Sequence, residues 1–144
     1  MAPTAGDAST ARHAIERVCS GQSPQDLERC YAPHFVDHVN SMEFHGHEGA
    51  RRSVALYQRV FPDLRFSVER QATEGDLVAS HWKLQGTNRG RAVELPGVTV
   101  SRFEDGRIAE DWSYSDTIEI ARQLGIWRSL LVVAREWRSL LGRE

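Results

Sequence analysis

Hydrophobic positions repeat with two different periods along the chain, and the change of period separates a helical part from a strand-rich part. Spacings of three and four over residues 7–18 predict an amphipathic helix that ends at Gly21. The pair Ser23-Pro24 has the residue types of a second helix start. A short strand is expected over residues 35–39, and helical spacing returns over residues 49–61.

The second half of the chain alternates apolar and polar residues, which is the period of half-buried strands. Its clearest turn is Asp105-Gly106, because an Asp-Gly pair between two alternating segments is typical of a two-residue hairpin loop. Pro96-Gly97 is interpreted as a break between strands. The strands expected in this half cover residues 65–72, 77–86, 93–95, 98–104 and 107–115.

Two further helices are predicted at the end of the sequence. The first covers residues 117–124, with Gly125 just after its end. The second covers residues 126–141, and its apolar face carries Trp127 and Trp137. Because two tryptophans are a large apolar surface for so small a protein, we expect this helix to pack either on its own domain or on a dimer partner.

Together these elements predict an α+β fold in which a bent antiparallel sheet and its helices form a cone around an apolar cavity. The length of 144 residues suits one such domain. We expect a flexible tail over residues 1–6, the cone domain over residues 7–125, and a separate amphipathic helix within residues 126–144.

The composition excludes several classes of function. The chain has 18 basic and 20 acidic residues, so it lacks the basic excess that nucleic-acid binding requires. No apolar segment approaches the roughly 18 residues that cross a bilayer, and the N-terminus does not read as a signal peptide. We therefore expect a cytoplasmic protein with no nucleic-acid or membrane partner. Cys19 and Cys30, without CxxC spacing, are interpreted as buried reduced thiols.

Four segments resemble the SnoaL-like polyketide cyclase family of the nuclear-transport-factor-2-like superfamily. They are YAPHFVDHV, GHEGARRSVALYQRVFPDLRFSVE, TEGDLVASHWKLQGTNRG and SRFEDGRIAEDWSYSDTIEIARQLG. The resemblance implies the cone fold and an intramolecular aldol-type ring closure without metal or cofactor. It also implies that Asp116 is the acid/base carboxylate.

The last strand carries candidate chemistry of its own. Period 2 places Glu110, Trp112, Tyr114 and Asp116 on one face, which suits the wall of a cavity. A carboxylate against aromatic rings is desolvated, and the resulting rise in pKa makes it a better base for a carbon acid. The tyrosine hydroxyl is a candidate donor to an oxyanion. The alternative for Asp116 is an N-cap of the following helix.

Two histidines are further candidates for proton transfer. His38 follows Asp37, and an inward imidazole with a carboxylate partner would be a second acid/base group; the alternative is a structural hydrogen bond. His81 and Trp82 are neighbours on one strand, so one of them faces the cavity. Phe35 and Tyr57 complete the residues predicted to line it.

These residues favour a cofactor-free cyclase or isomerase of secondary metabolism that acts on a small, apolar, polyketide-like substrate. The alternatives are a non-catalytic ligand-binding or dimerisation domain and an epoxide-opening enzyme. The cluster of Glu43, His45 and His47 is interpreted as a polar loop and not as a metal site, because spacing of two residues in a loop is a weak ligand motif. We expect no metal, no cofactor and a homodimer.

Overall fold

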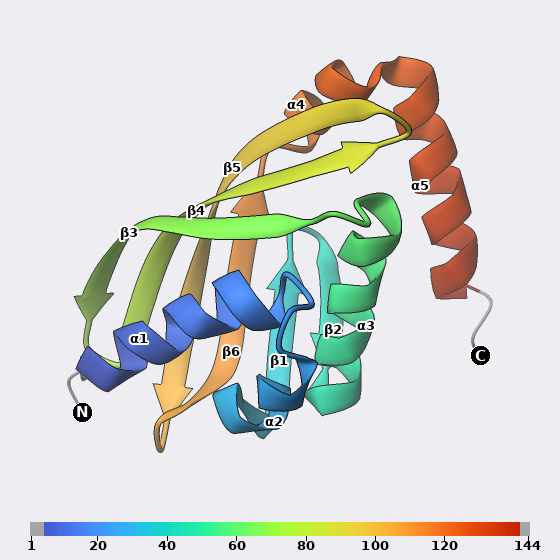
Figure 1. The fold of residues 1–144 in the computed structure, drawn as a ribbon. Coiled ribbons are helices and arrows are strands. Elements are labelled where there is room, and N and C mark those ends of the chain that lie inside the picture. Colours follow the sequence, from blue (N-terminus) through green and yellow to red (C-terminus); the bar gives the residue numbers. More distant parts are fainter. Residues whose placement is uncertain (1–4, 142–144) are drawn as a thin grey trace.

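The computed structural model describes residues 5–141, in which six strands form one curved sheet flanked by helices (Figure 1). Within the helix 126–141, side chains are described only at positions 127 and 130–136. The elements in chain order are α1 (Ala5–His13), a π-helical turn (Ala14–Val18), a 3₁₀ turn (Pro24–Asp26), α2 (Leu27–Cys30), β1 (Tyr31–Val39), β2 (Met42–His45), α3 (Gly46–Val60), β3 (Arg65–Glu74), β4 (Leu77–Asn88), β5 (Arg91–Glu104), β6 (Arg107–Ser115), α4 (Thr117–Leu124) and α5 (Ile126–Leu141).

The sheet has the strand order β2-β1-β6-β5-β4-β3 and is mixed. Four neighbouring pairs are antiparallel, but β1 and β6 are parallel. The expectation of a purely antiparallel sheet was therefore wrong at this one pair. Hairpins account for the antiparallel pairs, whereas β1 and β6 are joined by most of the chain, and so long a connection permits a parallel pair.

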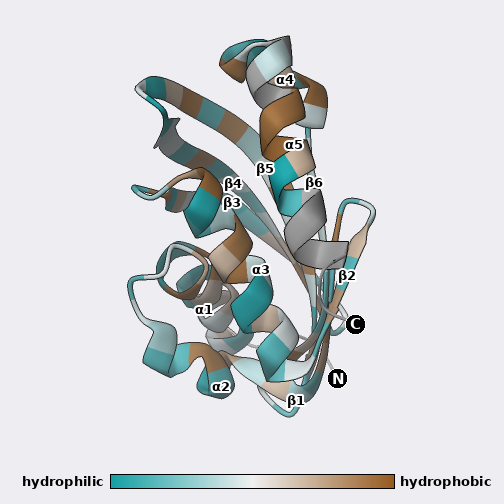
Figure 2. Cartoon of the chain, turned by 90° about the vertical axis from the view of Figure 1, so that its right-hand side faces the viewer, coloured by the Kyte–Doolittle hydropathy of each residue, from teal (hydrophilic) through white to brown (hydrophobic). Residues whose placement is uncertain are grey.

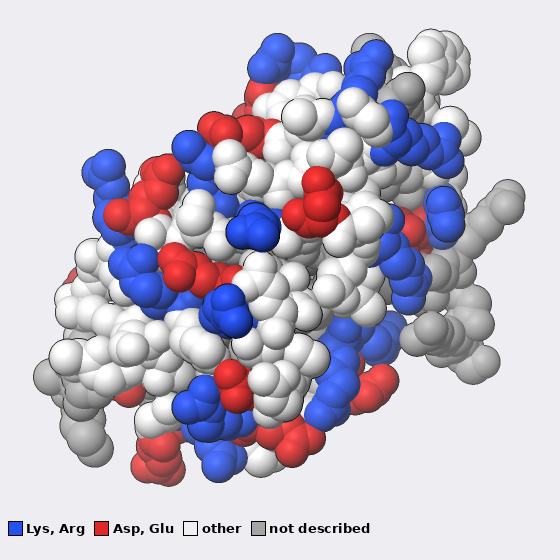
Figure 3. Space-filling view, viewed as in Figure 1, with Lys and Arg blue, Asp and Glu red and all other residues white. Residues whose placement is uncertain are grey.

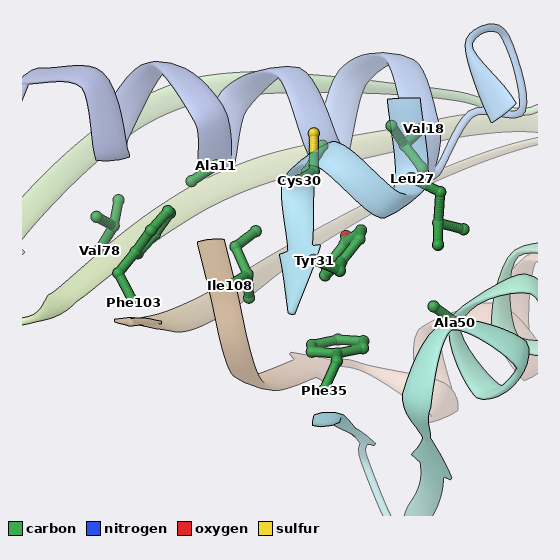
Figure 4. Close-up of a cluster of buried hydrophobic side chains, with 11 residues drawn as sticks. Ala11, Val18, Leu27, Cys30, Tyr31, Phe35, Ala50, Val78, Phe103 and Ile108 are labelled. Carbon is green, nitrogen blue, oxygen red and sulfur yellow. The ribbon is translucent and has the colours of Figure 1, made fainter. Parts of the chain in front are cut away.

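The sheet curves around three of the helices, which cover one of its faces. Figure 2 shows α1, α2 and α3 on this inner side. One core cluster gathers side chains from α1, α2 and the ends of the strands, and Figure 4 shows Phe35 below Tyr31 within it. The ring centroids of these two residues are 4.4 Å apart. A second cluster joins Ile15, Phe61 and Trp82 at the other end of the inner face. The α+β architecture predicted from the sequence is confirmed.

Turn chemistry explains where the strands end. Asp105 and Gly106 both have positive φ, 50° and 78°, as the predicted two-residue hairpin loop requires. The predicted break at Pro96-Gly97 was wrong, because β5 runs through both residues. Proline has no N–H to donate, but the other groups of the strand still pair with β4 and β6.

The first half contains more strand than the periodicity predicted. β1 begins at Tyr31, and Met42–His45 forms the edge strand β2 where a loop was expected. The edge strand pairs with only one neighbour, β1. The segment alternates apolar and polar residues, but four residues are too few for the pattern to distinguish a short strand from a loop.

The C-terminal helices lie at one end of the sheet, and α5 runs beside the end of α3 (Figure 1). A contact of 3.5 Å joins Arg59 on α3 to Glu136 on α5. Trp127 is 81% exposed and Leu130 is 55% exposed, so this side of α5 is not covered by its own domain. The pairing of this helix with a second copy stays a prediction.

The remaining expectations concern the ends and the surface. Residues 1–4 of the predicted tail lie outside the described residues, and Ala5 and Gly6 begin α1. No helix among the described residues is both long and apolar enough to cross a membrane. Acidic and basic side chains are interspersed over the face in Figure 3.

Candidate active site

A cavity of about 50 Å³ lies between the inner face of the sheet, the π-helical turn and α3. It has room for a few water molecules, and a fused-ring ligand of the expected kind does not fit unless the walls move apart. Its walls are mostly apolar, and its polar groups gather on β1, β5 and β6. The lining residues are Ile15, Cys19, Tyr31, Asp37, Val39, Ser53, Val54, Tyr57, Phe66, Trp82, Thr99, Asp111 and Ser113.

Two aspartates stand side by side at this cavity. Asp37 on β1 and Asp111 on β6 are directly paired across the parallel strands, so their side chains leave the same face of the sheet. Both are buried, with 9% and 6% of their surface exposed. Two carboxyl groups so placed cannot both ionise without mutual repulsion, so one of them retains a proton.

Burial separates the two carboxyl groups in acidity. Desolvation raises the pKa of Asp37 to about 6, although a hydrogen bond with Ser53 on α3 and the proximity of His38 oppose the rise. Desolvation and the charge of Asp37 raise the pKa of Asp111 well above its ordinary value. Burial of both carboxyl groups therefore favours retention of one proton by the pair, and Asp111 is the member whose protonated form burial and the charge of Asp37 favour.

The environment of Asp111 leaves part of its hydrogen-bonding capacity unused. Within the described residues, its Oδ1 atom is buried and has no hydrogen-bond partner. Ser101 lies opposite Asp111 on β5, and its hydroxyl lowers the pKa of this carboxyl only slightly against the larger effect of burial. A buried carboxyl oxygen without a partner costs stability, which is typical of groups kept for function.

Other polar groups at the cavity belong to side chains that pack closely. The indole Nε1 of Trp82 donates to Oγ1 of Thr99 at 2.9 Å, and this oxygen lies 2.8 Å from Oγ of Ser113. Cys19 Sγ lies 3.6 Å from the Tyr31 hydroxyl. Burial raises the pKa of the Cys19 thiol to about 12, so this cysteine is not a nucleophile at neutral pH.

The predicted cavity face of β6 was wrong by one residue. Glu110, Trp112 and Tyr114 do share a face, but it is the outer face of the sheet, and Asp111 and Ser113 line the cavity instead. Tyr114 is 58% exposed. On this strand the inward residues Asp111 and Ser113 are small, while the large aromatic walls of the cavity come from other elements, such as Tyr57 on α3 and Trp82 on β4.

Asp116 lies at the N-terminus of α4 and not among the cavity residues. Its Oδ1 accepts hydrogen bonds from the backbone N–H groups of Ile118 and Glu119, at 3.0 and 3.1 Å. The side chain is exposed. The alternative that the sequence left open, a helix N-cap, is therefore the geometry observed.

The two candidate histidines also lie outside the cavity. His38 contacts Glu110 through Nε2 at 2.8 Å and Glu43 through Nδ1 at 3.3 Å, and its ring stacks on Trp112. His81 lies 3.7 Å from Glu69 on the outer face. The contacts of His38 match the structural hydrogen bond given as its alternative, and Trp82 rather than His81 is the member of its pair that faces inward.

Two of the predicted lining residues are in place. Tyr57 and Trp82 line the cavity, whereas Phe35 is 1% exposed and lies in the first core cluster. The sequence analysis missed Asp37 and Asp111 as site residues. The available signal was the alternation of Phe35, Asp37 and Val39, because a carboxylate between two inward apolar residues is a buried carboxylate.

The predicted polar loop around Glu43 forms ordinary contacts. His45 pairs with Glu43 at 2.7 Å, and His47 donates to the backbone carbonyl of Tyr31 at 2.8 Å. From Ala5 to Leu141, no group of three or more His, Cys, Asp and Glu side chains has an arrangement that could hold a metal ion.

A model of the SnoaL-like polyketide cyclases matches residues 9–124. The chain belongs to this family. Wild-type IdmH from Streptomyces antibioticus is 26% identical over 83% of this chain and 98% of its own, with a TM-score of 0.74. A loop-truncated variant of IdmH is 28% identical over 83% of this chain and 99% of its own, with a TM-score of 0.73.

Other solved structures agree in fold. TsrD from Streptomyces laurentii has a TM-score of 0.74 at 22% identity, over 85% of this chain and 97% of its own, which is evidence for the fold alone. No curated protein matches the chain. The predicted SnoaL-like family is confirmed, and it supports a cyclase role in general terms. α5 lies beyond the residues that the family model matches.

Proposed function

We propose that this SnoaL-like protein catalyses ring closure of a polyketide-like substrate by acid/base chemistry at Asp37 and Asp111. The observation that carries the proposal is the pair itself, in which two buried carboxyl groups on adjacent strands face one cavity. Burial raises the pKa of both groups, which favours one retained proton. Environments that push the acidities of two neighbouring groups apart are typical of assigned acid and base roles.

The reaction follows from this protonation state. Ionised Asp37 removes a proton from the carbon next to a substrate carbonyl, which forms an enolate. The enolate carbon attacks a second carbonyl carbon, a C–C bond forms, and the new alkoxide oxygen takes the proton of Asp111. A proton then passes from Asp37 to Asp111 and restores the pair, so no proton is gained or lost overall.

The size of the cavity limits what can react there. About 50 Å³ accommodates a reacting carbonyl group and little more, so the remaining part of a larger substrate has to displace the walls or lie at the mouth. Apolar walls exclude water from the enolate, which strengthens the electrostatic interactions within the site.

The test uses a small carbon acid, so that the natural substrate is not required. Wild-type protein should accelerate deuterium exchange from D₂O into pentane-2,4-dione, followed by NMR. We expect Asp37→Asn to lower this rate by about 10²–10⁴-fold, because an amide cannot accept the proton. The matched control is Asp116→Asn, which changes an exposed aspartate of the same charge and should alter the rate less than about twofold. Equal rates for Asp37→Asn and wild type would refute the proposal and favour a ligand-binding domain.

The same pair also suits epoxide opening, in which an acid protonates the epoxide oxygen while a base activates water. This second candidate is favoured by the split acidities of Asp37 and Asp111. No arginine is among the described residues that line the cavity, so the two carboxyl groups would have to supply this chemistry alone. Consumption of propylene oxide, together with failure to exchange the diketone, would select this candidate.

A further inference from the structure

A chain of three hydrogen-bonding side chains crosses the sheet and ends at the cavity. It begins at Trp82 on β4, passes through Thr99 on β5 and ends at Ser113 on β6. The donor–acceptor distances are 2.9 and 2.8 Å. Ser113 lies two residues after Asp111 on the same face of β6, so the two side chains are separated by roughly 7 Å along the strand.

The direction of this chain is fixed at its first member. An indole N–H can only donate, so Thr99 accepts from Trp82. Thr99 is 5% exposed, and its own hydroxyl proton must find an acceptor. The distance alone allows either hydroxyl to donate. Because Ser113 Oγ is the one further side-chain partner of the buried threonine hydroxyl within the described residues, we assign Thr99 as the donor and Ser113 as the acceptor.

In this arrangement the hydroxyl proton of Ser113 has no acceptor among the described side chains. Its oxygen already accepts from Thr99, and no other described side chain forms a hydrogen bond with it. Oδ1 of Asp111, the nearby orphan acceptor, has no partner and therefore does not use this proton. The serine O–H is left to be donated into the cavity, where its polarity is increased by the two donors behind it.

The position of the Trp82 ring depends on a glycine in the neighbouring strand. Gly97 lies opposite Trp82 on β5, and a Cβ at this position would stand 2.2 Å from the indole ring. The missing side chain lets the ring lie across β5 and reach Thr99, two residues further along the strand. Glycine is unfavourable inside a strand, but at position 97 it is required because any side chain would overlap the indole ring.

We infer that the Ser113 hydroxyl donates a hydrogen bond to the substrate oxygen that becomes negatively charged, and that Thr99 and Trp82 are positioning residues which fix the direction of this donor. The inference rests on the proposed function for the identity of its ligand, because the oxygen that Ser113 would face is that of the enolate formed in the proposed reaction. It adds a stabilising donor for the enolate oxygen, a role that the sequence had suggested for Tyr114 or a histidine.

Binding of an enolate tests this role without turnover. In the Asp37→Asn background the cavity has lost its anionic base, and the enolate of pentane-2,4-dione is detected by its absorbance. We expect Ser113→Ala in this background to weaken enolate binding by about 10–100-fold, because the lost hydrogen bond is to a charged oxygen. Binding of the neutral diketone should change less than about threefold. Ser67→Ala, at an exposed serine on β3, is the matched control.

Two variants of Thr99 separate positioning from packing. Thr99→Val keeps the shape but removes the donor to Ser113, so we expect enolate affinity to fall several-fold while affinity for the neutral diketone is kept. Thr99→Ser retains the hydroxyl and should restore the enolate affinity. Unchanged enolate binding in Ser113→Ala, or equal binding in the valine and serine variants, would overturn the inference. If instead Asp37→Asn fails to slow exchange while Ser113→Ala weakens enolate binding, the proposed function fails and the donor stands.

Discussion

The two faces of the β1–β6 pair treat neighbouring carboxyl groups in opposite ways. On the outer face, Glu110 receives a hydrogen bond from His38 and contacts Arg102 at 3.3 Å, and these interactions hold its pKa below the ordinary value. On the inner face, the next residue along the chain is Asp111, whose pKa is raised by burial and by the charge of Asp37. Two consecutive residues therefore differ in how their environment treats the charge. Ion-pair partners favour the charged form of Glu110, whereas burial favours the protonated form of Asp111.

This difference shows which electrostatic arrangement stabilises the fold and which is available for chemistry. Partly exposed ion pairs such as His38–Glu110 contribute little to stability, because water screens them. The buried pair destabilises the folded state at neutral pH, because Asp37 must ionise in an apolar cavity. Such a cost is typical of groups retained for catalysis.

The largest expected effect is on the stability of the inner face. The pKa of Asp37 is about 6 in the folded state against an ordinary 3.8, so the folded protein binds this proton more tightly. Its contribution to stability is therefore complete below about pH 4 and is lost as the pH rises through 6. Asp37→Asn should match wild type near pH 4 and exceed it by about 3 kcal/mol above pH 6.

Urea unfolding followed by tryptophan fluorescence, repeated between pH 4 and pH 8, measures this difference. Asp116→Asn is the control, because its carboxylate caps α4 in solvent and should give a difference from wild type without this pH dependence. A gap between Asp37→Asn and wild type that stayed constant with pH would contradict the assigned burial of the charge.

A smaller effect concerns the pH dependence of the exchange reaction. We expect the rate to rise with a pKa of about 6 as Asp37 ionises, and to fall at higher pH as Asp111 loses its proton. Each limb should change about tenfold per pH unit. In Asp111→Asn the falling limb should disappear, because an amide does not ionise. A falling limb that persists in this variant belongs to another group and would remove Asp111 from the acid role.

The smallest effect is expected on the outer face. Glu110→Gln removes the charged partner of His38 and Arg102, whose side chains are 27% and 30% exposed. Because water screens these pairs, the free energy of unfolding should fall by less than about 1 kcal/mol, and by less still in 1 M salt. Exchange of pentane-2,4-dione should stay within about twofold of wild type. A tenfold loss of exchange would extend the site to the outer face.

Periodicity predicted most of the fold because each period has one dominant physical cause. The strands of the second half and the Asp105-Gly106 turn follow from alternation and from the positive φ that the turn requires. The edge strand Met42–His45 was missed because four alternating residues are too few to distinguish a strand from a loop. The local hydrophobic pattern could not predict the parallel pairing of β1 with β6, because this pairing depends on packing between segments far apart in the sequence.

The candidate site was predicted less well, and for a physical reason. Alternation correctly grouped Glu110, Trp112 and Tyr114 on one face, but it does not say which face is inside. Aromatic residues suggested a cavity wall, whereas the cavity is lined on this strand by Asp111 and Ser113. The composition of β6 alone does not tell which of its faces is inside, because the helices that cover the sheet are positioned by the neighbouring strands as well.

The contact between Trp82 and Gly97 has a consequence for how the sequence can drift over evolutionary time. A methyl group at position 97 would overlap the indole, so position 97 can enlarge only after position 82 has shrunk. The two positions should therefore covary among homologues, with any side chain at 97 accompanied by a smaller residue at 82. Where both have changed, the serine at position 113 would lose its fixed orientation, and such homologues are the natural variants in which to look for altered chemistry.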